Sequence, residues 1–196
     1  MLIDFIKEVE KADECVAHNG DRYDIKWLRT RCAKHNIFIP DKIDTFDTLK
    51  KARKQFNFNS NKLDYIAKFF GFKGKTNTGG FQLWVDVLNG SEKALNKMVK
   101  YCENDVVILE KVFNKIYKYS EVNQHTGVNF GEHRWSCVKC GSQKIRSNGT
   151  RTTKSGTTSH RMRCRSCGGG WTVSSAVYKN YLTWQYDKKN KKKDSE

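Results

Sequence analysis

The sequence predicts a helix-rich α/β domain followed by a small β module that contains four paired cysteines. Apolar residues recur at helical spacing over most of residues 1–120, and only two short stretches there read as strands. Two Cys-x2-Cys pairs follow near the C-terminus. Positive charge is concentrated in the same part of the chain, which favours two modules of different character.

In the first module the apolar spacing predicts a run of helices interrupted by two extended segments. Ile25, Leu28 and Cys32 share one face of the second helix. In chain order we expect a helix at 2–12, a buried strand at 14–18, a helix at 22–35, a strand or extended piece at 37–45, and helices at 46–56, 61–70, 80–89, 92–100 and 101–119. Two strands are few for so many helices, so either the domain is nearly all α or a piece of sheet is missing from this chain.

The expected domain boundaries follow from a loss of periodicity after residue 120. The prediction is a first domain at 1–120, a polar linker at 121–134, a cysteine module at 135–176 and a basic tail at 177–196. The last nine residues, KKNKKKDSE, are expected to be disordered.

The composition of the 196 residues favours a folded protein that resides in a reducing compartment. The hydrophobic fraction is 37%, and five Trp, eight Tyr and eleven Phe are available for a core. No apolar run approaches 18 residues, and the start, MLIDFIKEVEKAD, has no signal-peptide pattern. We therefore expect no membrane association and a cytoplasmic location, in the host cytoplasm if the source is a virus. Thiols there serve as metal ligands or core residues.

The net charge of +16 is unevenly placed. Residues 1–130 hold 22 basic and 17 acidic side chains, a net of +5, whereas residues 131–196 hold 15 and 4, a net of +11. A module of this charge density attracts polyanions, with nucleic acid as the first candidate. The alternative is a surface that only aids solubility.

The cysteine pairs have the spacing of a four-thiolate zinc site. The ligands are Cys137, Cys140, Cys164 and Cys167, and each pair can form a tight knuckle around one tetrahedral ion. Gly141 and Gly168 directly follow the pairs, where a left-handed backbone is often required. The segment between the pairs reads as a hairpin. The pattern resembles the zinc ribbons of transposases and phage DNA-processing proteins; two disulfides or unrelated thiols are the alternatives.

The ribbon carries side chains suited to nucleic acid. Basic groups can neutralise phosphates while aromatic groups stack on bases. The basic candidates are Arg146, Arg151, Arg161 and Arg163, with Lys144 and Lys154, and the aromatic candidates are His160, Trp135 and Trp171. Many ribbons contact protein instead, so this alternative stays open.

Two acids in the first module stand out. Asp24 opens a helix directly after a strand that ends in His18-Asn19-Gly20, which would hold a carboxylate at the edge of a sheet. Asp105 lies one helical turn after Tyr101, so both side chains share a face. Both features have a structural alternative. Asn19-Gly20 can simply form a turn, with Asp24 favoured by the dipole at the start of its helix. Tyr101 can be a core residue and Asp105 a surface acid.

In this order the pieces resemble the tyrosine-containing DEDD 3′–5′ exonucleases, which have the ribonuclease H-like fold. That family's Asn-x3-Phe/Tyr-Asp motif is matched by Asn19 to Asp24, and its Tyr-x3-Asp motif by Tyr101 and Asp105. The intervening stretch IDTFDTLKKARKQFNFNSNKLDYIAKFFG is similar to family B polymerase proofreading domains. The resemblance covers about residues 1–118.

The resemblance implies two-metal hydrolysis of phosphodiester bonds in single-stranded nucleic acid, with DNA favoured over RNA. Asp24 and Asp105 would bind Mg²⁺ or Mn²⁺, and Tyr101 would orient the attacking water. Asn19 would shape the turn and touch the terminal nucleotide. Phosphate contacts are expected at Lys62, Lys73 and Lys75, with a solvated face as the alternative.

One part of the family pattern is absent. An Asp-x-Glu strand should precede Asn19 by some tens of residues, yet only 18 residues stand there. We therefore expect a chain that begins after the catalytic hairpin, and that alone is a poor nuclease. A late start codon, a split gene whose second polypeptide supplies the strands, and a decayed copy remain open. So do a non-catalytic zinc-dependent nucleic-acid-binding protein and a docking subunit, while Lys- and Asn-rich composition suggests a phage source.

Overall fold

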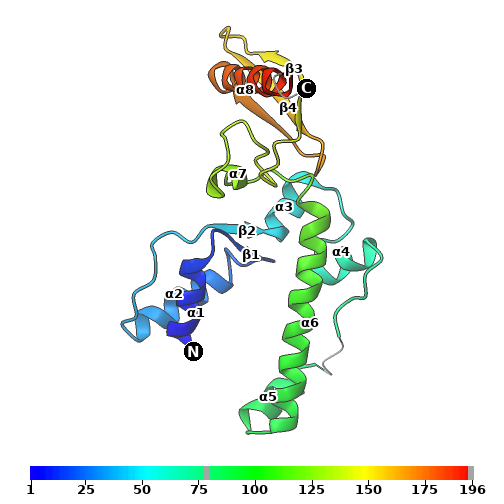
Figure 1. The fold of residues 1–196 in the computed structure, drawn as a ribbon. Helices are drawn as coiled ribbons and strands as arrows, with labels where there is room; N and C mark the ends of the chain where they lie inside the picture. Colours follow the sequence, from blue (N-terminus) through cyan, green and yellow to red (C-terminus); the bar gives the residue numbers. More distant parts are fainter. Residues whose placement is uncertain (77–79, 194–196) are drawn as a thin grey trace. The chain divides into compact units, whose positions relative to one another are not determined.

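A computed structural model describes residues 1–76 and 80–193 and divides the chain into two compact units. Unit 1 spans Met1–Glu121 and unit 2 spans Val122–Glu196 (Figure 1). Within the described residues, no helix is both long enough and apolar enough to cross a bilayer.

Unit 1 consists of six helices and two short strands among its described residues. In chain order they are α1 (Leu2–Lys11), β1 (Cys15–Ala17), α2 (Asp24–Lys34), β2 (Thr45–Asp47), α3 (Thr48–Gln55), α4 (Leu63–Phe69), α5 (Gln82–Leu88) and α6 (Glu92–Ile116). The two stretches expected at 92–100 and 101–119 form one continuous helix, α6, whose first turn is capped by the Ser91 side chain. The mixed, helix-rich α/β class is confirmed.

The strands of unit 1 are parallel and align Cys15 with Thr45 and Ala17 with Asp47. Both C-terminal ends therefore meet at one edge, where the loop that follows β1 lies beside the start of α3. β2 begins at residue 45, at the end of the expected 37–45 segment. The expectation of a buried first strand is wrong, because the Val16 side chain is 37% exposed.

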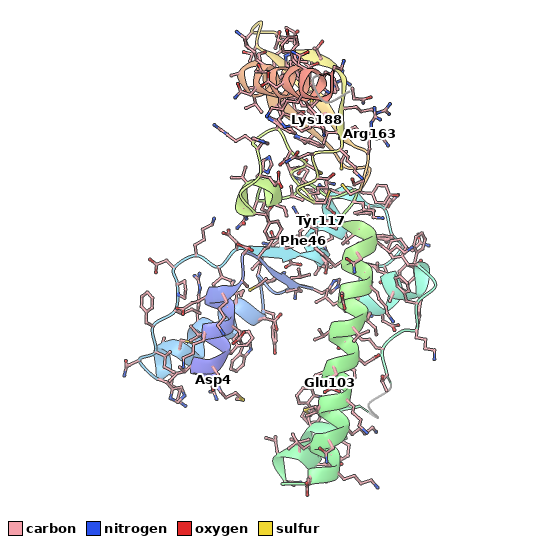
Figure 2. The ribbon with its side chains drawn as sticks, in the orientation of Figure 1. Asp4, Phe46, Glu103, Tyr117, Arg163 and Lys188 are labelled. Carbon is pink, nitrogen blue, oxygen red and sulfur yellow. The ribbon has the colours of Figure 1, made fainter. Side chains whose placement is uncertain are left out.

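Two separate hydrophobic clusters hold unit 1 together. The larger joins β2, α3, α4 and α6 around Phe46, which is fully buried and meets the Phe113 ring edge-on at 5.0 Å. Figure 2 shows Phe46 near Tyr117, whose ring lies 5.5 Å away. The smaller cluster joins α1 and α2 through Ile6, Leu28 and Cys32.

Unit 1 leaves apolar side chains in contact with solvent. No strand other than β2 pairs with β1 among residues 1–76 and 80–193, so one edge of β1 is free there. Large exposed side chains on β1, α2 and α6 are Val16, Trp27, Leu95, Val99, Val106 and Val107. The expected shortage of strands and the expected exposure of apolar helix faces are thus both present.

Unit 2 is an antiparallel three-stranded sheet covered by a long helix. It contains α7 (Thr126–Asn129), β3 (Ile145–Thr152), β4 (Thr158–Cys164), β5 (Gly170–Ser174) and α8 (Ser175–Lys193), and the sheet order is β3-β4-β5. The expected hairpin is β3–β4, with Arg146 opposite Arg163 and Thr152 opposite Thr158. The core includes Trp135, Met162 and Val173 from the sheet side and Tyr181 from α8.

Two expectations about the ends of the ribbon need correction. The tail expected to be disordered is helical as far as Lys193, because Val177, Tyr178, Tyr181 and Trp184 recur at helical spacing and pack on the sheet. Residues 194–196 lie outside the described part. The segment 121–134, expected as a linker, is folded from residue 122 onward: Thr126 N donates to the Val138 carbonyl at 2.9 Å.

Candidate active site and metal centre

The loop after β1 is held by a buried carboxylate. Asp47, only 3% exposed, accepts hydrogen bonds from the backbone N–H of Asn19 at 2.9 Å and of Asp21 at 3.4 Å. Its Oδ1 also accepts from the N–H groups of Leu49 and Lys50, which caps α3. Asn19 itself has a left-handed backbone, with φ of 74°. Asp47 therefore holds the turn at Asn19, which we expect to contact substrate, and also caps α3.

His18 is anchored at the same edge. Its Nε2 faces the Asn61 carbonyl at 3.1 Å, and its Nδ1 lies 2.9 Å from Thr48 Oγ1. Because a carbonyl only accepts hydrogen bonds, Nε2 carries a proton. Burial lowers the pKa of His18 below its ordinary value. The imidazole thus ties β1 to the segment before α4.

A cavity of about 630 Å³ opens beside this loop. Two predicted substrate contacts, Asn19 and Lys62, line it together. Basic side chains dominate the wall, since Arg53, Lys62 and Lys75 face a single carboxylate, Asp64, among the lining residues. A cavity with this charge balance suits a phosphate-bearing ligand.

Tyr101 and Asp105 are brought together by Lys75. The Lys75 ammonium lies 2.7 Å from Asp105 Oδ2 and 3.2 Å from the Tyr101 hydroxyl. Burial alone would lower the pKa of Lys75, but these two contacts outweigh it and hold the pKa above its ordinary value. The Asp105 side chain is 23% exposed, and its buried Oδ1 has no hydrogen-bond partner within the described structure. A carboxylate, a phenol and a cation thus share one corner next to the cavity.

Asp24 is not brought to this corner by any contact. It is exposed in the first turn of α2 and makes no hydrogen bond or ion pair with Tyr101 or Asp105 in the described chain. Asp24 belongs to the helix of the smaller hydrophobic cluster, whereas Asp105 lies on α6 of the larger one. Their convergence on a common cation, expected from the sequence, remains a proposal.

Sequence reasoning gives no role to three polar residues of this region: His18, Asp47 and Arg53. Asp47 has a usable signal, because it is an acid that ends a strand and precedes a helix. The sequence identifies Lys75 only as a phosphate contact, and no spacing rule connects it with Tyr101 and Asp105 across about 30 residues.

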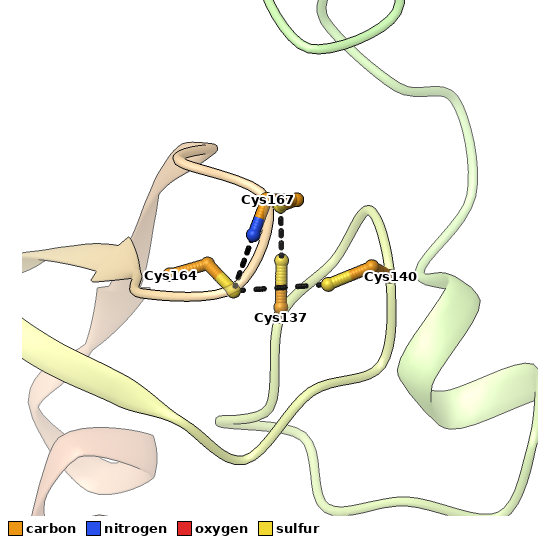
Figure 3. Close-up of side chains that lie close together, drawn as sticks. All are labelled: Cys137, Cys140, Cys164 and Cys167. Carbon is orange, nitrogen blue, oxygen red and sulfur yellow. Dashed lines mark hydrogen bonds between the residues drawn. The ribbon is translucent and has the colours of Figure 1, made fainter. Parts of the chain in front are cut away.

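The four cysteine sulfurs of unit 2 gather at one point, as Figure 3 shows. All four Sγ atoms lie within 4.8 Å of one another, with Cys137–Cys167 at 3.6 Å and Cys140–Cys164 at 3.7 Å. A zinc–sulfur distance of about 2.3 Å in a tetrahedron requires sulfur separations of about 3.8 Å. The sulfur set therefore fits zinc. Among the described residues it is the one group of three or more His, Cys, Asp or Glu side chains close enough to share an ion.

The knuckles provide backbone support for thiolates. Cys164 Sγ accepts from the N–H of Ser166 at 3.3 Å and of Cys167 at 3.5 Å. Burial opposes ionisation, yet these N–H groups lower the pKa of Cys164 to about 7, while burial raises the pKa of Cys140 to about 11. Gly141 and Gly168 have φ of 68° and 73°, which confirms the left-handed positions expected after each pair.

The four candidate arginines share one face of the ribbon sheet. Side chains alternate along a strand, and Met162 and Cys164 of β4 are buried, so Arg161 and Arg163 point to the opposite, exposed face. The ladder pairs Arg146 with Arg163 and Arg151 with Ser159, which places both β3 arginines on that same face. The Arg146–Arg163 pair sets like charges directly opposite each other, which is unfavourable without an anion.

The expected base-stacking aromatics need correction. Trp135 is 3% exposed and packs against Trp184 at 4.6 Å between centroids. Trp171 is half-buried against the ribbon core, and its buried Nε1 has no partner in the part described. His160 stacks on Tyr178 of α8 at 3.9 Å. Trp135 is therefore a core residue, buried against a helix that the sequence analysis did not predict.

Comparison with known proteins identifies the first unit. A family model described as the RNase_H superfamily matches residues 1–117, which is more than half of the chain. No curated protein and no solved structure matches the chain. This superfamily processes nucleic acids, which agrees with the cationic cavity and the Tyr101–Asp105 corner. The chain belongs to the RNase H superfamily.

Proposed function

We propose that the chain acts as a 3′–5′ exonuclease on single-stranded nucleic acid, mainly DNA, in the cytoplasm. The observation that carries the proposal is the Tyr101–Asp105 corner, which holds a cation beside a basic cavity lined by Asn19 and Lys62. Membership of the RNase H superfamily supports nucleic-acid hydrolysis in general. The 3′–5′ direction is our inference from the motif spacing.

Each side chain has a role in this proposal. Asn19 and Lys62 hold the terminal nucleotide in the cavity, with Lys62 on a phosphate. The Tyr101 hydroxyl orients the attacking water. Asp105 Oδ1, buried and without a hydrogen-bond partner in the described structure, offers a ligand oxygen for Mg²⁺ or Mn²⁺. Lys75 occupies the other oxygen and gives it up when a divalent ion binds.

The described residues do not complete a two-metal site. Mg²⁺ or Mn²⁺ would activate a water and stabilise the leaving 3′ oxygen, but two ions need bridging carboxylates beyond Asp24 and Asp105. We infer that a strand carrying two acids pairs with the free edge of β1, from a further segment or from a second polypeptide. The exposed Val16 side chain on β1 and the exposed valines of α6 support this location.

The test uses single-stranded DNA labelled at either end and the protein purified with everything that accompanies it. With Mn²⁺ we expect mononucleotides released from the 3′ end. Asp105→Asn should abolish release, and Tyr101→Phe should slow it by about 100-fold, because water orientation is lost.

A matched control is Glu103→Gln, which removes the same charge from an exposed position of the same helix, labelled in Figure 2. It should leave release unchanged. Unaltered activity in Asp105→Asn, or loss of activity in Glu103→Gln to the same degree, would contradict the assignment.

The ribbon is proposed to grip the substrate. Between His133 and Tyr186 the sequence has ten Lys or Arg residues and no acid. Phosphates can bind on the sheet face shared by Arg146, Arg151, Arg161 and Arg163. A bound phosphate would also relieve the repulsion between the opposed Arg146 and Arg163. Replacing Arg146 and Arg163 with Gln should weaken binding similarly for all base sequences.

A second candidate is a zinc-dependent nucleic-acid-binding protein without catalysis. It is favoured by one finding: the cysteines alone form a complete ligand set in the described residues. This candidate predicts binding that survives Asp24→Asn with Asp105→Asn and disappears when zinc is removed. Detection of 3′ hydrolysis would reject it.

A further inference from the structure

The second unit contains a groove that no role has yet explained. It encloses about 870 Å³ between the first zinc knuckle and the C-terminal half of α8. The polar wall is basic: Lys144, Arg165, Lys188 and Lys189 line it with one acid, Glu132. The Glu132 carboxylate accepts a hydrogen bond from Gln143 at 2.6 Å. None of the four cations has an ion pair within the described part of the chain.

The groove is a built feature, because α8 is anchored to the sheet beside it. The buried Tyr181 hydroxyl donates to the Ile145 carbonyl at 3.3 Å, and Gln185 Nε2 donates to the same hydroxyl at 2.6 Å. These bonds fix the helix against the start of β3. The Lys188 ammonium is held 4.7 Å from the centre of the Trp184 ring at the groove wall.

The groove begins where the β3–β4 ladder ends, at the zinc end of the unit. Arg165 N donates to the Lys144 carbonyl at 2.7 Å, two residues beyond the Arg146–Arg163 pair on each strand. Lys144 directly precedes β3, Arg165 directly follows β4, and both line the groove together with residues of α8. The basic residues at this end of the ladder therefore connect the Arg146–Arg163 pair with the groove.

We propose that this groove binds single-stranded nucleic acid, as the continuation of the strand held on the arginine face. Four cations without an ion pair in a concave site favour a polyanion, and exposed Phe130 adds a ring on which a base can stack. A flexible single strand can enter a cavity of this size, whereas a duplex cannot. The proposal rests on nucleic acid being the substrate of the chain, as proposed above.

The test measures binding of a fluorescent oligothymidylate to the zinc-loaded full chain at several salt concentrations, without divalent ions so that no hydrolysis occurs. Lys188→Gln should weaken binding about 5-fold at 0.1 M salt and reduce the salt slope by about 0.7. Lys144→Gln with Lys188→Gln should weaken it about 25-fold.

Lys179→Gln is the matched control, because Lys179 is exposed on the same helix and does not line the groove. It should stay within about twofold of the unaltered chain, since neutralising a lysine away from the strand removes no phosphate contact. Zinc content and circular dichroism of each variant verify the fold.

The outcomes separate this proposal from the proposed function. If the double variant Lys144→Gln with Lys188→Gln binds as tightly as Lys179→Gln, the groove does not bind the strand. The proposal for the arginine face would not be affected. Competition by polyglutamate as effective as that of an oligonucleotide of equal charge would assign the groove to an acidic polypeptide and reject our ligand. Failure of the unaltered chain to bind would reject both proposals.

Discussion

The two units differ in how completely they cover their own apolar surface. In unit 2, α8 covers one face of the sheet, and Trp135, Met162 and Tyr181 are buried together. In unit 1, two small clusters share no residue, and strand β1 has a free edge in the described structure. Unit 2 thus brings its four cysteines together by itself, whereas unit 1 is open at the strand edge where we propose that further carboxylates enter.

The difference reflects how each site is assembled. The four cysteines come in two pairs, each spanning four residues, and the β3–β4 hairpin between the pairs brings the two knuckles together. The corner of Tyr101, Asp105 and Lys75 instead depends on packing between α6 and a segment outside any helix or strand. We therefore expect unit 2 to depend on its metal, and unit 1 to depend on its core and on a carboxylate-capped loop.

Removal of zinc should have the largest effect. The core of unit 2 is small, so we expect zinc binding to supply about 10 kcal/mol or more of its folding free energy. Chelation should expose Trp135 and shift tryptophan emission to longer wavelength, while most helical ellipticity from unit 1 remains. Acidification should release zinc, because protons compete with the metal for the four thiolates.

The control for this prediction compares two cysteines. Cys140→Ser should lose zinc, whereas Cys102→Ser, at an exposed position of α6, should retain it. An unchanged emission spectrum after metal analysis has verified zinc loss would show that the ribbon folds without its ion.

The second largest effect is expected from shortening a side chain in the hydrophobic core of unit 1. Phe46 is fully buried between Phe113 and Tyr117, so Phe46→Ala should cost about 3–5 kcal/mol of stability. Urea unfolding followed by circular dichroism measures the loss. Zinc content should be unaffected, and a variant that loses zinc as readily as helicity would show that the two units fold together.

Much of the helical framework and the clustering of the four cysteines could be predicted from the sequence. Helical periodicity and the Cys-x2-Cys spacing are local signals, and Gly141 and Gly168 have the expected backbone. Helix α8 was missed because charge at 188–193 obscured the apolar spacing of Tyr178, Tyr181 and Trp184. Burial of Trp135 and the position of Lys75 depend on tertiary packing, which no local pattern specifies.

Substitution of Asp47 tests whether this side chain holds the loop after β1. Asp47→Asn preserves the shape but replaces one acceptor oxygen with an NH₂ group that faces the Asp21 N–H. The expected loss is about 2 kcal/mol in the urea unfolding of unit 1. Asp44→Asn is the control, because its side chain is 32% exposed and pairs with Lys42. Equal stabilities for the two variants would contradict the role of Asp47.

The smallest expected effect concerns the second knuckle of unit 2. Gly168 has φ of 73° and open space where a Cβ would stand, so Gly168→Ala adds backbone strain alone, about 1–2 kcal/mol. A zinc competition titration should show roughly tenfold weaker affinity, with Gly168→Asn intermediate because asparagine tolerates this conformation better. Gly170→Ala is the control, since its φ is not positive and an added Cβ would meet only Met162 O, at 3.7 Å. If both alanine variants lower the zinc affinity equally, the left-handed turn at Gly168 does not determine that affinity. The proposed dependence of unit 2 on local backbone geometry would then be wrong.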